Sequence, residues 1–475
     1  MLSAIAAKFR RVWSNQNSEI TVDNCGHAPF KRLQDARKIM EMFLERPADT
    51  IEPDVEAMDG LVFQSDILVD YAREMLHAYP YREVPPCWRE LYTDAGILKA
   101  LALGLGSHSK GTSSLKQAIL TCDSVLIMAG AAGAERKMLL YELIDALESK
   151  IEGQQEFSPS VQKRVKINRS FKLGEETEQR GPTPTIRYPI PRMALPTMDA
   201  FQQHVKQPLG GMPIVITGAI DHWPARERWT DLDTICRTAG PDRLVPIEIG
   251  SQYTDEQWTQ KMVTIREFIE QFILCDASRE SSRGHAGPDQ VLQEDQSHGR
   301  EVGYLAQHDL FDQIPRLRRD IDIPDYCMVE PLEQDGYCPP DDVLLNAWFG
   351  PEGTVSPMHT DPYYNLLAQV VGKKYVRLYA PNETSKLYCF GSEDAQELAA
   401  NEEPDQDHGQ ATSTSLLGNT SQVDVEHPDL TRHPLFAEAK YVETVLGPGE
   451  VLYIPFRWWH YVRSLSTSFS VSFWF

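Results

Sequence analysis

The pattern of apolar positions changes along the chain. Up to about residue 150, apolar residues recur every three or four positions, as at 67–76 and 139–147, and this spacing predicts amphipathic helices. Further on, short runs rich in β-branched and aromatic residues are bounded by Gly and Pro, at 212–218, 244–249, 375–380, 451–455 and 469–475. Many short strands of this kind are typical of a barrel or a double-sheet jelly roll.

This change predicts an α+β protein. Residues 1–150 are expected to form a helical interaction domain without a cluster of ionisable residues, and residues 151–190, polar and proline-containing, a linker. A β-rich domain is expected over residues 191–475. Two polar stretches interrupt it near 276–300 and 387–418, and we interpret both as surface insertions.

Charge and cysteine content narrow the class of partner. The formal net charge is −23, which argues against direct nucleic-acid binding, because a phosphate backbone is met by clustered Lys and Arg. It suits a basic protein or peptide partner, although an acidic protein whose excess charge lies in loops is an equally good interpretation. None of the eight cysteines has a C-x-x-C spacing, and no apolar run is long enough to span a membrane. We therefore expect a reducing compartment and no membrane partner.

His359 and Asp361 have the spacing of a metal-binding pair. Non-haem iron oxygenases hold iron with two His and one carboxylate, and a spacing of two on an extended segment points both side chains the same way. The pair is weak evidence by itself, since 13 His and 69 acids give about two His-x-acid triplets by chance. His427 and Asp429 form a second such pair, but in a polar turn with no strand beside it. His359 instead follows an apolar run and a Gly/Pro turn.

A third ligand has to come from elsewhere in the fold. His460 is the best candidate, because it follows the apolar run 451–455 and two Trp residues. A histidine in such a place is more often a packed core residue. The presence of His359 and Asp361 reverses that preference.

Lys374 is a candidate for binding an anionic co-substrate. Strand alternation places it on the same face as Val376 and Leu378, and a lysine on an apolar inward face is costly unless it is paired. The distal carboxylate of 2-oxoglutarate would pair it. The alternative is that this face points outward and leaves Lys374 in solvent. The final strand, 469–475, has one apolar face and one face of small polar residues, which suits either a cavity wall or a half-exposed edge strand.

Several long segments of residues 191–475 resemble the JmjC oxygenases, and most closely the subfamily of lysine demethylase 8, whose members are also described as arginyl hydroxylases. These segments are VGYLAQHDLF at 302–311, IPDYC at 323–327, NAWFG at 346–350, NTSQVDVE at 419–426, and WHYVRSL at 459–465 with the ending SFSVSFW at 468–474.

The resemblance implies a double-stranded β-helix that uses Fe(II), 2-oxoglutarate and O₂, with iron bound by the triad named above. It implies 2-oxoglutarate contacts at Tyr304, Ser356, Asn365 and Lys374. Trp348 and Trp474 would line the same pocket. Glu248 and Trp258 match residues that receive the target side chain, and an acid beside an aromatic face suits a guanidinium. A location in the nucleus, the cytoplasm or both is also implied.

Hydroxylation of arginine in a protein is the first hypothesis for the reaction. Demethylation of N-methyl-lysine in histones is the second, and a JmjC scaffold without activity or a small-molecule cupin enzyme are further alternatives. Asp361 favours the hydroxylase, because many JmjC demethylases carry Glu at that position. Two features depart from the subfamily pattern. They are the aromatic pair Tyr363 and Tyr364 where polar amides are usual, and the acidic insertion after Phe390.

Overall fold

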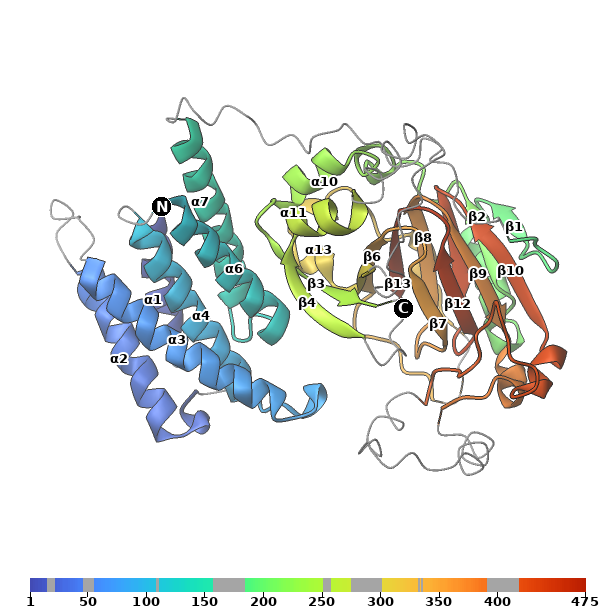
Figure 1. Cartoon of the computed structure of the whole chain (residues 1–475), viewed down its shortest axis with the longest axis horizontal. Coiled ribbons are helices and arrows are strands. Elements are labelled where there is room, and N and C mark those ends of the chain that lie inside the picture. Colours follow the sequence, from blue (N-terminus) through green and yellow to red (C-terminus); the bar gives the residue numbers. More distant parts are fainter. Residues whose placement is uncertain are drawn as a thin grey trace, which may run out of the picture. The chain divides into compact units, whose positions relative to one another are not determined.

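The computed structural model describes residues 1–14, 22–45, 55–107, 111–156, 184–250, 258–274, 301–331, 334, 336–390 and 418–475. The chain divides into two compact units (Figure 1). One comprises residues 1–166 and 240–245, and the other residues 167–239 and 246–475. Most of the linker predicted at 151–190, all of the insertion at 276–300 and residues 391–417 of the second insertion lie outside the described residues.

The first unit is built from helices, as the spacing of apolar residues predicts. They are α1 (Leu2–Ser14), α2 (His27–Leu44), α3 (Val55–His77), α4 (Pro86–Leu105), α6 (Thr112–Ala129) and α7 (Arg136–Glu156). Helix α4 is the central one, because nearly all of its residues are buried. A helix that is apolar on every side is stable only when other helices surround it.

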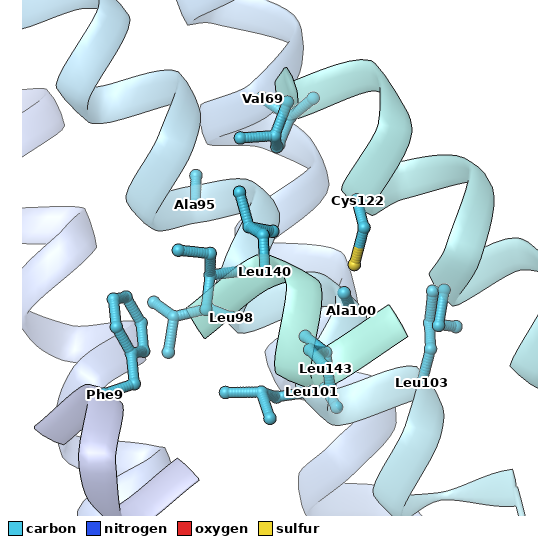
Figure 2. Close-up of a cluster of buried hydrophobic side chains, with 14 of the residues drawn as sticks. Phe9, Val69, Ala95, Leu98, Ala100, Leu101, Leu103, Cys122, Leu140 and Leu143 are labelled. Atoms are coloured by element: carbon cyan, nitrogen blue, oxygen red, sulfur yellow. The ribbon is translucent and has the colours of Figure 1, made fainter. Parts of the chain in front are cut away.

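Leucines and small residues of α4 form the middle of this core (Figure 2). Leu98 and Leu101 of α4 gather with Leu140 and Leu143 of α7 and with Phe9 of α1. Where α4 meets α6, Gly96 leaves no room for a side chain, since a Cβ atom there would lie 2.2 Å from Cγ2 of Val125.

The expectation that this unit contains no cluster of ionisable residues is wrong. The carboxylate of Asp94 on α4 is fully buried and accepts hydrogen bonds from Arg136 at 2.6 and 3.1 Å and from Arg37 at 2.5 Å. The partners lie 42 and 57 residues away in the sequence. No local pattern could reveal the cluster, because packing of α2, α4 and α7 creates it.

The second unit contains two β-sheets, shown in green to red in Figure 1. Among the described residues, one sheet has nine strands in the order β1-β2-β11-β8-β13-β6-β5-β3-β4, and the other has four in the order β10-β9-β12-β7. The strands are β1 (Arg192–Ala194), β2 (Ile214–Thr217), β3 (Leu244–Ile249), β4 (Thr259–Thr264), β5 (Gly303–His308), β6 (Leu344–Gly350), β7 (Val355–His359), β8 (Asn365–Val371), β9 (Lys374–Tyr379), β10 (Tyr441–Leu446), β11 (Glu450–Ile454), β12 (Trp459–Ser464) and β13 (Ser468–Trp474). Short helices connect them, namely α8 (Met198–Val205), α9 (Ala225–Arg228), α10 (Leu232–Ala239), α11 (Ile265–Phe268), α13 (Leu310–Gln313) and α14 (Pro315–Arg318).

The predicted α+β jelly-roll architecture is confirmed, and all five predicted strands are present. The last strand, β13, is not an edge strand, because it pairs with β8 on one side and β6 on the other and is buried throughout. Its small polar face is also used internally. Ser470 donates a hydrogen bond to Gln369, and Ser472 accepts one from the indole of Trp348.

Apolar residues cover both faces of the four-stranded sheet. One face contributes Val376, Leu378 and Val462 to a core shared with Leu367 and Ile454 of the nine-stranded sheet. The other face packs under Leu387 and Cys389, which are buried. The packed chain therefore continues past the predicted start of the second insertion. Among the described residues, no helix has both the length and the apolar composition that a membrane crossing requires.

Candidate active site

Strand pairing brings the two predicted histidine ligands together. His359 ends β7, His460 lies near the start of β12, and the two residues are direct partners in the antiparallel ladder. Their ring centroids are 4.2 Å apart. A β-bulge follows between His460 and Val462, which is a common feature next to functional sites.

Asp361 lies two residues beyond the end of β7 and completes the group. Its carboxylate oxygens are 3.8 Å from Nε2 of His359 and 3.5 Å from Nε2 of His460. The backbone N–H of Thr360 donates to the carbonyl of Asn419, and the amide of Asn419 donates back to the carbonyl of Thr360. The segment that begins at Asn419 therefore holds the turn that presents Asp361.

This group fits a divalent metal. The ligand atoms of all three residues lie within 4.8 Å of one another. The Nδ1 atoms of His359 and His460 lie 2.7 and 3.0 Å from the carbonyl oxygens of Pro357 and Trp458. An Nδ1–H donated to a carbonyl leaves Nε2 with a free lone pair, which is the usual arrangement of a metal-binding histidine. Burial lowers the pKa of His460 to about 4, helped by the neighbouring His359, so its ring is neutral as a ligand must be.

A pocket of about 350 Å³, part of it open to solvent, adjoins these three residues. It is lined by Tyr304, Trp348, Ser356, His359, Asp361, Asn365, Leu367, Lys374, Ile454, His460 and Val462. The lining thus includes Lys374 and four further residues that the resemblance implied, namely Tyr304, Trp348, Ser356 and Asn365. Sequence reasoning missed the apolar lining residues Leu367, Ile454 and Val462, which only the register between strands could reveal.

Lys374 is buried in this wall, as the alternation on its strand predicts. It is 2% exposed, so the alternative of a solvated lysine is wrong. Its Nζ donates to the hydroxyl of Tyr304 at 3.1 Å, and burial lowers its pKa to about 7. Oδ1 of Asn365, also buried, has no hydrogen-bond partner. A buried ammonium without a counter-charge is incomplete until an anion enters the pocket. The amide oxygen of Asn365 needs a hydrogen-bond donor instead.

Neither residue predicted to receive the substrate side chain lines the metal pocket, but Glu248 lies beside Tyr304, which does. Glu248 on β3 is the ladder partner of Tyr304 on β5. Burial raises the pKa of Glu248, and the nearby indole of Trp258 opposes that shift. Burial raises the pKa of Tyr304 above its usual value, and the negative charge of Glu248 adds to that increase.

The place of Trp474 differs from the one that the resemblance implied, and the two unusual tyrosines also lie outside the lining of the metal pocket. Trp474 does not line the metal pocket but a neighbouring groove, and the ring of Tyr363 stacks on it with centroids 5.7 Å apart. Tyr364 is fully buried, and its hydroxyl accepts a hydrogen bond from Gln334. His427, the histidine of the second His-x-acid pair, is exposed and lies outside the pocket.

Comparison with known proteins agrees with this geometry. Residues 199–475 match the family of cupin-like domains. Lysine-specific demethylase 8 of Xenopus tropicalis is 37% identical over 449 residues, which cover 86% of this chain and 87% of that protein. Lysine-specific demethylase 8 of Danio rerio is 38% identical over 419 residues, or 86% of each chain. Jumonji C domain-containing protein 5 of Drosophila melanogaster is 33% identical over 407 residues, covering 86% of this chain and 85% of the relative.

The matched region contains every strand of both sheets except β1, and all three residues of the His359, Asp361 and His460 group. The relatives also match well beyond that region, over most of both chains. The chain therefore belongs to the cupin-like JmjC family that includes lysine-specific demethylase 8, and it is a 2-oxoglutarate-dependent dioxygenase.

Proposed function

We propose that this protein is an Fe(II)- and 2-oxoglutarate-dependent hydroxylase that acts on arginine side chains of a basic protein substrate. His359, Asp361 and His460 hold the iron, since two imidazoles and one carboxylate on one side of a metal leave positions free for co-substrate and O₂. When bound, iron and 2-oxoglutarate supply the activation of O₂, and 2-oxoglutarate leaves as succinate and CO₂.

The pocket residues bind and orient the co-substrate. The ammonium of Lys374 pairs with the distal carboxylate of 2-oxoglutarate. The hydroxyl of Tyr304 and the N–H groups of the Asn365 amide donate hydrogen bonds to the oxygens of the co-substrate. Ser356 lies in the same wall. The apolar side chains of Leu367, Ile454 and Val462 exclude water from the reacting atoms, which strengthens the charge pairing with Lys374.

The carboxylate of Glu248 is the observation that carries the choice of arginine. It is desolvated enough for its pKa to be raised, it lies beside Tyr304 at the pocket wall, and no described cation forms an ion pair with it. A partly buried carboxylate without an ion-pair partner is stabilised by a cation that also donates hydrogen bonds to it. A guanidinium does so through two parallel N–H groups, and its flat face stacks on an aromatic ring such as that of Trp258.

Demethylation of N-methyl-lysine is the second candidate, and the names of the relatives favour it. It requires the same hydroxylation, placed on a methyl group that then leaves as formaldehyde. Methylation removes N–H donors from the ammonium, so a methylated lysine satisfies the Glu248 carboxylate less well than a guanidinium does. Asp361 also favours arginine hydroxylation, because many JmjC demethylases carry Glu at that position.

The test compares two peptide sets in one assay. Peptides with a central arginine or a central methyl-lysine, otherwise identical, are incubated with Fe(II) and 2-oxoglutarate, and products are identified by mass spectrometry. We expect one added oxygen on arginine, lost in His359→Ala and reduced in Glu248→Gln but not in Glu330→Gln, which changes an exposed acid. Loss of a methyl group without arginine oxidation would instead establish the demethylase.

A basic protein partner and a location in the nucleus or cytoplasm remain part of this proposal. Turnover measured at rising salt concentration tests whether the partner is basic. A substrate selected by its charge should show a KM that rises with ionic strength, because salt screens exposed charges. Localisation of a fluorescent fusion tests the second.

A further inference from the structure

The segment 419–426 does not line the metal pocket, yet its first residue bonds to the chain between two proposed metal ligands. Thr360 lies between His359 and Asp361. Its backbone N–H donates to the backbone carbonyl of Asn419 at 3.0 Å. Its carbonyl accepts a hydrogen bond from the side-chain amide of Asn419 at 2.9 Å. Asn419 therefore holds both backbone polar groups of the residue that joins the two ligands.

The backbone of Thr360 decides whether both ligands can face one metal ion. Side chains two positions apart point to the same side only while the chain between them stays extended. Rotation about the backbone of Thr360 would turn the carboxylate of Asp361 away from His359 and His460. The two hydrogen bonds to Asn419 oppose this rotation, because both would have to break.

Backbone pairing places Asn419 at this position. His359 and Thr420 form an antiparallel bridge, and His359 also pairs with His460 on β12. The end of β7 therefore has a neighbour on each edge. One residue further along, a side-chain N–H of Asn419 takes the place of a backbone donor for the carbonyl of Thr360.

The chain that follows Asn419 is itself anchored. Cys389 and Ser421 form a second antiparallel bridge. The hydroxyl of Ser421 donates to the carbonyl of Leu387 at 2.6 Å, and the side chain of Leu387 is fully buried in a core. The packing of that core therefore supports the segment from which Asn419 reaches Thr360.

We propose that Asn419 is a positioning residue for the metal. It keeps the carboxylate of Asp361 on the side of the two histidines, and in this way it sets how tightly the metal ion is held. The inference rests on the proposed metal site but not on the choice of arginine as substrate. Residues that orient metal ligands contribute about 10- to 100-fold to metal affinity. Asn419 is exposed and acts through the backbone, so we expect an effect near the lower end of that range.

Metal affinity can be measured without turnover. Metal-free protein is titrated with Co(II), and the visible absorption of the bound ion reports both its affinity and the arrangement of its ligands. Asn419→Ala removes the amide but keeps the backbone carbonyl that accepts from Thr360. We expect the dissociation constant to rise about tenfold and the absorption spectrum to change. Asn382→Ala changes an exposed asparagine outside the metal pocket and should bind Co(II) as the unsubstituted protein does.

A double-mutant cycle tests whether Asn419 acts through Asp361. Asp361→Ala alone weakens Co(II) binding, because one of three ligands is lost. Adding Asn419→Ala to that variant should weaken binding no further, since the side chain that Asn419 positions is already absent. If the two losses are additive, Asn419 acts by another route and the inference is wrong.

Stability separates positioning from a general structural role. The side chain of Asn419 is exposed, so metal-free Asn419→Ala should unfold at nearly the same urea concentration as the unsubstituted protein. A lower unfolding midpoint with unchanged Co(II) affinity and spectrum would overturn the inference. If Asn419→Ala matches the unsubstituted protein in every measurement, Asn419 does not position the metal, although the metal site stands. If the unsubstituted protein binds no Co(II), the proposed metal site and this inference fail together.

Discussion

The ammonium nitrogen of Lys374 lies 3.1 Å from the hydroxyl oxygen of Tyr304, and both side chains are buried in the wall of the metal pocket. The phenol is neutral, so it offers the ammonium a hydrogen bond but no counter-charge. Burial alone lowers the pKa of Lys374 to about 7. The protein therefore contains a positive charge that becomes favourable only when an anion enters the pocket.

Binding of 2-oxoglutarate should therefore depend on pH. Below about pH 7, Lys374 is already protonated and the dissociation constant stays flat. Above pH 7, the free pocket has lost the proton and must take it up again to pair with the carboxylate, so the dissociation constant should rise up to about tenfold per pH unit.

Calorimetry with Mn(II)-loaded protein measures this dependence, and buffers of different ionisation enthalpy report the proton uptake directly. Lys374→Met removes the titrating group and is expected to bind 2-oxoglutarate far more weakly, with little change between pH 7 and 9. A pH-independent affinity in the unsubstituted protein would mean that Lys374 keeps its proton throughout.

Metal binding should depend on three side chains and not on the second His-x-acid pair. His359→Ala and Asp361→Ala are each expected to lose bound metal and succinate production together, because two remaining ligands hold a divalent ion weakly. Elemental analysis after desalting gives the metal content. His427→Ala, which changes an exposed histidine of the other pair, serves as the control and should retain metal and activity.

The helical unit should be sensitive to its buried carboxylate. Asp94→Ala leaves Arg136 and Arg37 without their shared partner, and removing one member of a buried ion cluster costs roughly 3–5 kcal/mol of stability. Urea unfolding followed by the helical circular dichroism signal measures this loss. Asp70→Ala breaks the exposed pair with Arg73 and should cost no more than about 1 kcal/mol. Equal losses for the two variants would contradict the structural role of Asp94.

The close contact between α4 and α6 predicts that a side chain at Gly96 destabilises the helical unit. Gly96→Ala places a Cβ atom against Val125 and should destabilise the unit by about 1–3 kcal/mol through overpacking. Adding Val125→Ala should recover part of that loss, which a double-mutant cycle detects.

Gly60→Ala is the matched control. Gly60 lies inside α3, and no atom lies within 4 Å of where its Cβ would be placed. Replacing a helical glycine in open space should stabilise the protein by about 0.4–1 kcal/mol. If both alanine variants change stability in the same direction, the close approach of α4 and α6 is not what constrains Gly96.

Much of the fold follows from local pattern. The three- and four-residue spacing predicts the helices, and period-two alternation at 374–379 correctly predicts that Lys374 is buried with Val376 and Leu378. Alternation did not decide the role of β13, because a strand with one apolar face looks the same at an edge as in the middle of a sheet. Pairing with β6 and β8 decided it.

The amino-acid sequence by itself determined the residue types of the site and the spacing of His359 and Asp361. Only the tertiary structure decided that His460 lies opposite His359, that Asp94 joins two distant arginines, and that Asn419 bonds to the backbone of Thr360. The reason is the range of the interactions. Side-chain direction along one strand or helix is set by neighbouring residues, whereas the register between strands far apart in the chain is set by the packing of the whole sheet.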